Sequence, residues 1–225
     1  MSEEATNITT FDESGLGSGS ATKQPEGTVR RWTRDAIVQD AAKVFREKGY
    51  HGTSIQDIVD ATGLQRGGIY YYIKSKDNLL IDIMDQALAA FIEAQETIFN
   101  SDLEPGEKLR QLLEQHILME IENLDGFSCC QTELRCLSPE ERQRQAQQRG
   151  IYEGMLKQVI QDGIERGAFK HVNVKAAVLA IMGMFNWLVN WYSADGPLGA
   201  DELSKIFATF ALDMLATTTG EGRHS

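Results

Sequence analysis

The sequence predicts an all-α fold in two parts: an N-terminal three-helix helix-turn-helix domain and a C-terminal helical domain for ligand binding and dimerisation. Two short helical patterns flank a glycine turn within residues 53–76. From Lys76 onward apolar residues recur with helical periods, and no strand alternation appears. The 225 residues are enough for two hydrophobic cores. We expect domains at residues 28–80 and 81–217, between disordered tails at 1–27 and 218–225.

Charge is distributed unevenly along this acidic chain. The formal net charge is -11, yet residues 28–81 hold nine Lys or Arg against six Asp or Glu. Phosphate would repel the remainder, so we expect one face only to bind nucleic acid, which excludes general coating of DNA. Neither a nucleotide-binding loop nor a nucleophile–base pair appears, so we do not expect an enzyme. The N-terminal residues lack the apolar stretch of a secretory signal, which favours a cytoplasmic location.

The first two helices are marked by apolar spacing and by caps. Residues 34–48 carry apolar groups at helical intervals, and Gly49 follows as a stop signal. Either Thr53 or Ser54 is expected to cap the second helix, with Gln56 or Asp57 respectively completing a capping box. Gly63 stands where a helix C-terminus needs a positive φ. A helix would then start across the short turn that follows.

This third helix has the composition of a surface that reads DNA. Residues 65–68 carry almost no apolar bulk, and the two glycines among them allow close approach of the backbone to a duplex. Arg66 is suited to a guanine edge or a phosphate, and Tyr70 and Tyr71 to phosphate oxygens. Alternatively, the three consecutive tyrosines simply pack a small domain, as we expect of Tyr72. The predicted DNA-binding residues are Thr53, Ser54, Gln56, Gln65, Arg66, Gly67, Tyr70, Tyr71, Lys74 and Lys76.

Six further helices are expected in the C-terminal part. Ser75 can cap the first of them, while Pro105 and Pro139 suit first helical positions and Asn173 suits a cap. Asp195-Gly196-Pro197 breaks the chain before the last helix. The expected ranges are 76–100, 105–124, 127–136, 138–166, 173–192 and 201–216.

The last two of these helices carry the prediction of a homodimer. The helix at 173–192 is apolar nearly all round, so we expect one side to meet its own core and the other a twofold partner. A membrane span over 176–192 is the alternative, disfavoured by its length, by Asn186 and Asn190 and by the absence of flanking basic residues. The predicted interface residues are Val174, Val178, Ile181, Phe185, Leu188, Phe207, Phe210 and Met214.

A ligand pocket is expected inside the C-terminal domain. Its methionines and aromatic residues suit an apolar cavity for an irregular ligand, although each of them also suits an ordinary core. An anionic head group would need arginines at the mouth, for which Arg135, Arg142, Arg144 and Arg149 are candidates, or these arginines solvate a helix surface. The predicted ligand-binding residues are Met119, Phe127, Arg135, Tyr152, Met155, Met184, Trp187 and Trp191, with Met182 and Phe185 as further candidates for the lining.

A thiol sensor is a rival hypothesis for the same region. Cys129, Cys130 and Cys136 cluster in the sequence, as a redox-responsive site requires. No metal-ligand spacing joins them to His51, His116, His171 or His224.

From Trp32 to about Leu80 the chain resembles the DNA-binding domain of the TetR family of transcriptional regulators. Gln65 and Gly68 depart from the Ser or Thr of many relatives, so no base preference transfers. The resemblance implies a repressor that binds a palindromic operator as a dimer, paired through a four-helix interface of its last two helices. The motif residues are Phe45, Gly49, Tyr50, Gly52, Thr53, Ile58, Ala61, Gly63, Gly67, Ile69, Tyr70, Tyr71, Tyr72, Lys74, Ser75 and Lys76.

The C-terminal half is similar to a family subset that senses acyl-coenzyme A or related lipid catabolites. The similarity lies in residues 135–140, 149–152, 163–169 and 186–198. It implies release from DNA by a hydrophobic effector such as an acyl-CoA, with no other cofactor. The alternative is a regulator of efflux or stress genes that responds to a hydrophobic drug or to oxidation of the three cysteines.

Overall fold

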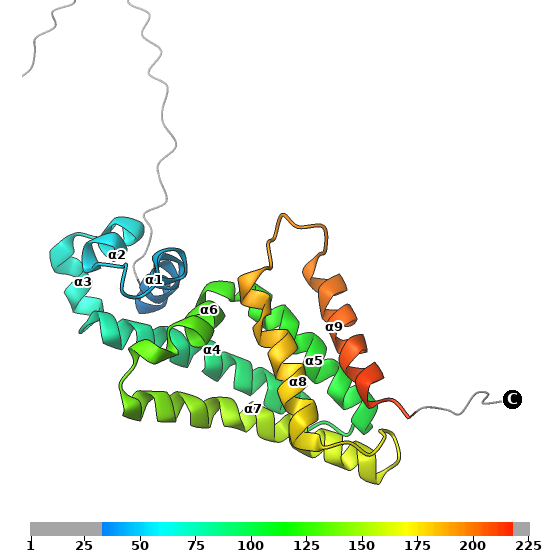
Figure 1. The fold of residues 1–225 in the computed structure, drawn as a ribbon. Helices are drawn as coiled ribbons and strands as arrows, with labels where there is room; N and C mark the ends of the chain where they lie inside the picture. The colour runs from blue at the N-terminus through cyan, green and yellow to red at the C-terminus, as the bar shows by residue number, and fades with distance from the viewer. Residues whose placement is uncertain (1–32, 218–225) are drawn as a thin grey trace, which may run out of the picture. The chain divides into compact units, whose positions relative to one another are not determined.

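The computed structural model describes residues 33–217, and within them every regular element is helical (Figure 1). The all-α prediction is therefore confirmed. The expected tails at 1–27 and 218–225 lie outside the described residues. The elements are α1 (Arg34–Lys48), α2 (Ile55–Thr62), α3 (Arg66–Tyr72), α4 (Lys76–Phe99), α5 (Pro105–Glu122), α6 (Leu124–Thr132), η1 (Leu134–Cys136), α7 (Pro139–Glu165), α8 (Val174–Asn186), η2 (Leu188–Asn190) and α9 (Ala200–Leu215).

Helices α1 to α3 form the expected helix-turn-helix unit. Ser54 caps α2: its Oγ accepts from the backbone N–H of Asp57 at 3.2 Å, and the carboxylate of Asp57 accepts from the N–H of Ser54 at 2.7 Å. Gly63 ends α2 with a φ of 72°, as its position in the sequence predicts. Thr53 is not the cap. It is buried, and its hydroxyl donates to the carbonyl oxygen of Gly49 at 2.8 Å.

The described residues pack into two hydrophobic cores, and α4 contributes to both. Ile58, Ile69 and Leu80 belong to the core of the helix-turn-helix unit, which also takes in Cys129 and Cys130 of α6. Phe91 belongs to the second core, built mainly from α5, α7, α8 and α9. Helix α6 packs on both α1 and α4 (Figure 1). The two halves of the chain are thus joined by α6 as well as by the continuous helix α4.

Two predicted helices differ from the observed ones. The helix expected at 127–136 starts earlier, at Leu124, and ends at Thr132 before the short turn η1. The helix expected at 173–192 stops at Asn186 and continues as η2. The Asn190 side chain donates to the carbonyl oxygen of Trp187 at 3.3 Å, a local bond that competes with helix continuation. No helix within residues 33–217 combines the length and apolar character that crossing a bilayer requires.

Candidate DNA interface and ligand pocket

Helix α3 presents one face to solvent and one to the core. Ile69 is fully buried and holds the helix on the first core, with Tyr72 partly buried beside it. Tyr71 is 86% exposed, and Gln65, Arg66 and Gly67 are exposed with it. A Cβ added at Gly67 would meet nothing within 4 Å, so the fold itself does not demand glycine there. The exposed face of α3 is therefore available to a partner outside the protein.

The loop before α2 is fixed to the start of α4, which sets the position of α3 between them. The Lys76 ammonium donates to the carbonyl oxygens of Tyr50 at 2.9 Å and Thr53 at 2.8 Å, and lies 4.3 Å from the centroid of the Tyr50 ring. Lys76 thus braces the unit instead of projecting freely toward DNA. Thr53 is buried, so these two of the ten predicted DNA-binding residues make contacts within the fold, and the DNA-binding role of all ten stays a prediction. Ser54, Gln56, Tyr70 and Lys74 remain at the accessible surface.

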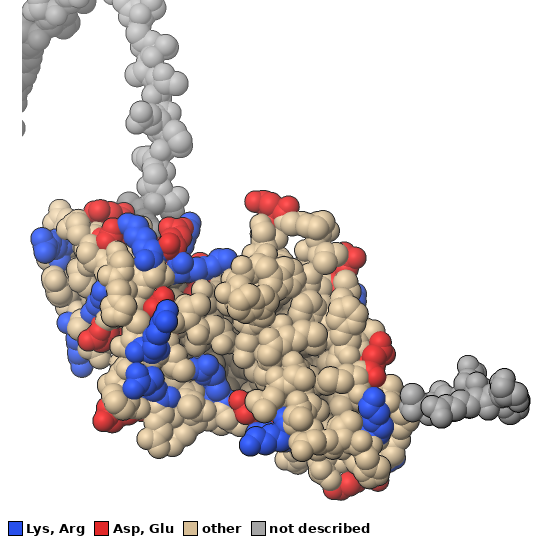
Figure 2. Space-filling view, in the orientation of Figure 1, with Lys and Arg blue, Asp and Glu red and all other residues tan. Residues whose placement is uncertain are grey.

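Charged side chains of both signs cover the surface over α1 to α4, whereas the surface over α8 is largely uncharged (Figure 2). Arg66 and Lys74 are exposed beside the exposed tyrosines of α3. Arg46 and Lys48 of α1 are instead paired, with Asp125 and Asp57. The exposed cations beside α3 are therefore placed where binding to phosphate would need them.

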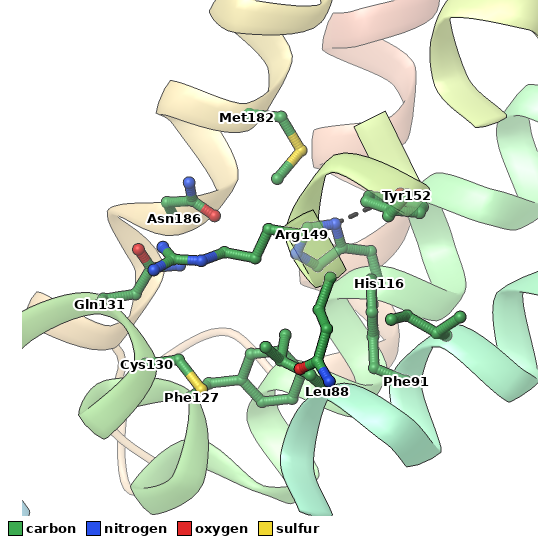
Figure 3. Close-up of a pocket in the computed structure, with 12 residues that line it drawn as sticks. Leu88, Phe91, His116, Phe127, Cys130, Gln131, Arg149, Tyr152, Met182 and Asn186 are labelled. Atoms are coloured by element: carbon green, nitrogen blue, oxygen red, sulfur yellow. Dashed lines mark hydrogen bonds between the residues drawn. The ribbon is translucent and has the colours of Figure 1, made fainter. Parts of the chain in front are cut away.

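A small pocket lies between α4, α5, α6, α7 and α8 (Figure 3). Its volume of about 30 Å³ holds roughly two water molecules. The lining residues are Leu88, Phe91, Ile92, His116, Phe127, Cys130, Gln131, Gln148, Arg149, Tyr152, Met182 and Asn186.

One side of this pocket is polar. Arg149 extends from α7 toward Gln131 of α6 and Asn186 of α8 (Figure 3). No hydrogen bond or ion pair joins the Arg149 guanidinium to the described part of the chain, and the buried Oε1 of Gln148 accepts no hydrogen bond there. A buried acceptor without a donor costs about 1–3 kcal/mol, so a ligand or water that donates there is favoured. The Arg149 guanidinium, which carries only donors, suits an anionic or oxygen-bearing group.

The opposite side is aromatic, and a buried histidine there lies beside a buried glutamate. His116 Nδ1 lies 3.3 Å from the Tyr152 hydroxyl, and His116 Nε2 lies 3.4 Å from an oxygen of Glu120. Phe91 packs edge-on against both the His116 and Tyr152 rings. Burial raises the pKa of Tyr152 well above its usual value, so its hydroxyl stays protonated. Sequence reasoning missed this pair, although the spacing of His116 and Glu120 by one helical turn is a signal for it.

The pocket contains two of the eight predicted ligand residues, Phe127 and Tyr152. Met155 is buried in the core, and Arg135 is exposed on η1. Trp187 and Trp191 are 64% and 46% exposed. Neither lines the pocket, and the Trp191 ring stacks on that of Phe207. Met184 is half-buried on α8 and does not line the pocket, and Met119 lines a separate groove. The helix period alone does not reveal which apolar residues face inward.

That groove, which we call the α1 groove, runs between α1, α4, α5 and the start of α6, with a volume of about 940 Å³. Its apolar lining comes from Val38, Ala42, Ile83, Ala87, Ala89, Ala90, Met119, Leu124 and Phe127. Its acidic lining comes from Asp35, Glu93, Glu122 and Asp125.

The face of α8 predicted to meet a second copy is buried in this protomer. Val178, Ile181, Phe185 and Leu188 have no exposed surface, so they cannot contact a partner. Phe210 of α9 is 57% exposed, while Val174, Phe207 and Met214 are partly buried. The other side of α8 exposes Ala176, Leu179, Ala180 and Gly183. Together with the exposed Trp187 and Phe210, these residues form an uncharged surface that we call the α8–α9 face.

Two of the three cysteines are buried, and the third, Cys136, has its Sγ 3.4 Å from His51 Nε2. Cys129 and Cys130 are buried, and their thiols point to the carbonyl oxygens of Ala42 and Met84 at 3.9 Å. Burial raises the pKa of Cys130 to about 12 and that of Cys129 further. Cys136 is partly exposed, and burial and the Glu133 carboxylate raise its pKa as well. A thiol sensor needs thiolate, so this geometry disfavours the redox alternative.

Comparison with known proteins gives consistent matches over both halves of the chain. Residues 37–83 match the model described as bacterial regulatory proteins, tetR family, and residues 102–215 match a tetracyclin repressor-like C-terminal domain. The fatty acid metabolism regulator protein of Bacillus subtilis is 28% identical over 160 residues, covering 68% of this chain and 82% of that protein.

Two examples among the solved structures that share this fold are PfmR and AibR. PfmR of Thermus thermophilus is 34% identical, with a TM-score of 0.73, covering 79% of this chain and 97% of that one. AibR, solved with isovaleryl coenzyme A and operator DNA, is 25% identical, with a TM-score of 0.71, covering 81% and 97%.

Proposed function

The chain belongs to the TetR family of bacterial transcriptional regulators, and we propose that it is a repressor that binds a palindromic operator as a homodimer and leaves it when a hydrophobic acyl thioester binds. The observation that carries the proposal is the exposed face of α3, where Arg66, Tyr70 and Tyr71 project from a helix held by buried Ile69. Such a protein acts in the cytoplasm and needs no catalytic residues.

The α8–α9 face supports the homodimer. Apolar patches of this kind on a folded chain mark interaction sites, and from Ala176 to Trp187 no charged residue interrupts the exposed apolar and small residues. A twofold pair would place two α3 helices in successive major grooves, about 34 Å apart. A palindromic operator follows from that symmetry.

Arg149 supports an anionic effector with an apolar body. Of the four candidate arginines, Arg142 donates to the carbonyl oxygens of Arg135 and Leu137, and Arg144 binds Asp85 and Glu141. Arg149 alone of the four lines the pocket. One matched protein is named as a regulator of fatty acid metabolism, and another, AibR, was solved with isovaleryl coenzyme A. An acyl thioester is also the class of effector proposed for this chain.

Helix α6 is the element through which the pocket would reach the DNA-binding unit. Phe127, Cys130 and Gln131 of α6 line the pocket. The same helix packs on α1, where Asp125 accepts a hydrogen bond from Arg46 at 3.0 Å. An effector that prefers a displaced α6 would shift the population away from the DNA-binding arrangement.

The test begins with selection of an operator from a random duplex library. We expect an enriched inverted repeat, bound with strong salt dependence, and release by palmitoyl-CoA at concentrations where coenzyme A alone has no effect. Arg149→Gln should weaken release without altering operator affinity. Enrichment of no inverted repeat would refute the operator proposal, and operator binding insensitive to every thioester would refute the effector proposal.

A further inference from the structure

Among the described residues, Phe127 alone lines both the pocket and the α1 groove. We infer that the two are halves of a single elongated effector site, closed in this structure by the Phe127 ring, and that the α1 groove receives the distal end of a long acyl chain. The inference rests on the proposed function and adds which ligands act and where their tails bind.

The size of the pocket requires a second compartment. A space of about 30 Å³ holds roughly two waters, far less than any acyl group beyond the shortest. The α1 groove, at about 940 Å³, shares the Phe127 wall with it. Rotation of this one aromatic side chain would join the pocket to a much larger groove whose lining mixes apolar and polar residues.

A buried carboxylate lies on a helix that contributes to both spaces. Glu120 lies on α5 next to Met119, which lines the α1 groove, and one turn from His116, which lines the pocket. Its side chain is fully buried, and neither carboxylate oxygen accepts a hydrogen bond from the described residues. The ionic neighbour that it does have is His116, at 3.4 Å. A buried carboxylate short of donors destabilises the packing around it.

Charge fixes the direction in which a ligand lies. Arg149 stands at the pocket end and attracts an anionic head group. The α1 groove carries Asp35, Glu93 and Glu122, which repel one. An acyl-CoA therefore keeps its phosphates on the Arg149 side and passes its hydrocarbon end beyond Phe127.

The distal end of such a chain reaches the DNA-binding unit directly. Val38 and Ala42 of α1 form one wall of the α1 groove. Val38 and Ala42 also belong to the first core, on which α3 is held. We therefore expect long acyl chains to displace α1 and release DNA, and short acyl chains to bind without doing so.

The test fills the α1 groove without touching the pocket. Ala90 is exposed on α4 and lines only the α1 groove, so Ala90→Phe blocks the tail compartment. Ala146→Phe, at an exposed alanine of α7 that lines neither space, is the matched control. Dissociation constants are measured for butanoyl-CoA, octanoyl-CoA and palmitoyl-CoA, and for the fluorescent fatty acid cis-parinaric acid, which needs no coenzyme A.

We expect Ala90→Phe to raise the dissociation constants of palmitoyl-CoA and cis-parinaric acid by roughly tenfold or more, because several methylene groups of the tail are no longer buried. The dissociation constant of butanoyl-CoA should be unchanged in Ala90→Phe. Ala146→Phe should bind all four ligands with the affinities of wild type. Phe127→Ala should lower the dissociation constants of the long-chain ligands. Equal affinities of Ala90→Phe and Ala146→Phe for the long-chain ligands, or no binding of any long-chain ligand, would overturn the inference. If Ala90→Phe weakens the binding of cis-parinaric acid but no ligand affects operator binding, the tail compartment is supported and the proposed regulation is refuted.

Discussion

Val178 and Leu179 are consecutive residues of α8 with opposite environments: Val178 is fully buried in the protomer, and Leu179 is 56% exposed. Consecutive residues of a helix point about 100° apart, so adjacent positions fall on different faces. Leu179 shares its face with Gly183 and Trp187, one and two turns further on. The apolar stripe that looked like a dimer seam in the sequence is the protomer's own core, and the exposed stripe beside it is the surface left for a partner.

Charged substitutions on the α8–α9 face are expected to give monomers. Leu179→Glu and Phe210→Glu would place carboxylates in the proposed apolar interface without entering the core, because both side chains are largely exposed. We expect a monomer by light scattering, unchanged helical circular dichroism, and weaker operator binding. Ile151→Glu, at an exposed residue of α7 away from this face, is the control. A stable dimer in both face variants would place the interface elsewhere.

Arg66 and Lys74 are expected to differ in what they contribute to DNA binding. Both are exposed beside α3, but Arg66 opens the helix while Lys74 follows it. Arg66→Ala should reduce the free energy of binding to the selected operator by about 1–3 kcal/mol, and that of binding to random duplex by less, as expected for a base contact. Lys74→Ala should weaken both duplexes alike and lower the salt slope by about one. Equal losses for Arg66→Ala on both duplexes would make it a phosphate contact. Arg110→Ala, at a partly exposed residue of α5 that pairs with Glu107, serves as the control.

The cap of α2 should make stability depend on acid pH. Hydrogen bonds from Lys48 and Ser54 hold the pKa of Asp57 well below its usual range. A carboxylate with a lowered pKa in the folded state stabilises the fold above the unfolded pKa, and the gain is lost as pH falls through the folded pKa. The melting temperature of Asp57→Asn should therefore lie below that of wild type at pH 7, and the gap should narrow below about pH 4, the ordinary range of an aspartate pKa. A gap that is constant with pH would contradict this assignment.

Native thiols are expected to resist modification. Cys129 and Cys130 are buried with raised pKa values, so at a mildly alkaline pH almost no thiolate forms. We expect a disulfide reagent to leave both unmodified in the native protein and to label all three cysteines after denaturation. Cys136→Ser isolates the two buried thiols in this measurement. Rapid labelling of the variant, or release of operator by peroxide, would restore the redox hypothesis.

Local signals in the sequence were enough for the helix-turn-helix unit. The start of α1 at Arg34, the Ser54–Asp57 box and the left-handed Gly63 all depend on residues within one or two turns of each other. The starts of α5 and α7 at Pro105 and Pro139 were predicted for the same reason. The ends of α6 and α8 were less accurate, because side-chain bonds such as that from Asn190 to Trp187 compete with helix formation there.

An all-α protein with glycine, arginine and tyrosine on the helix expected to face DNA could be predicted from the chain alone, because capping, turn chemistry and helical period are short-range properties. Packing between distant segments established which side of α8 is core, that Thr53 and Lys76 brace the fold, and that His116 lies between Tyr152 and Glu120. An apolar helix such as α8 has no polar face to orient it. Its inward side is therefore chosen by the shape of the helices that pack against it, which no local pattern encodes.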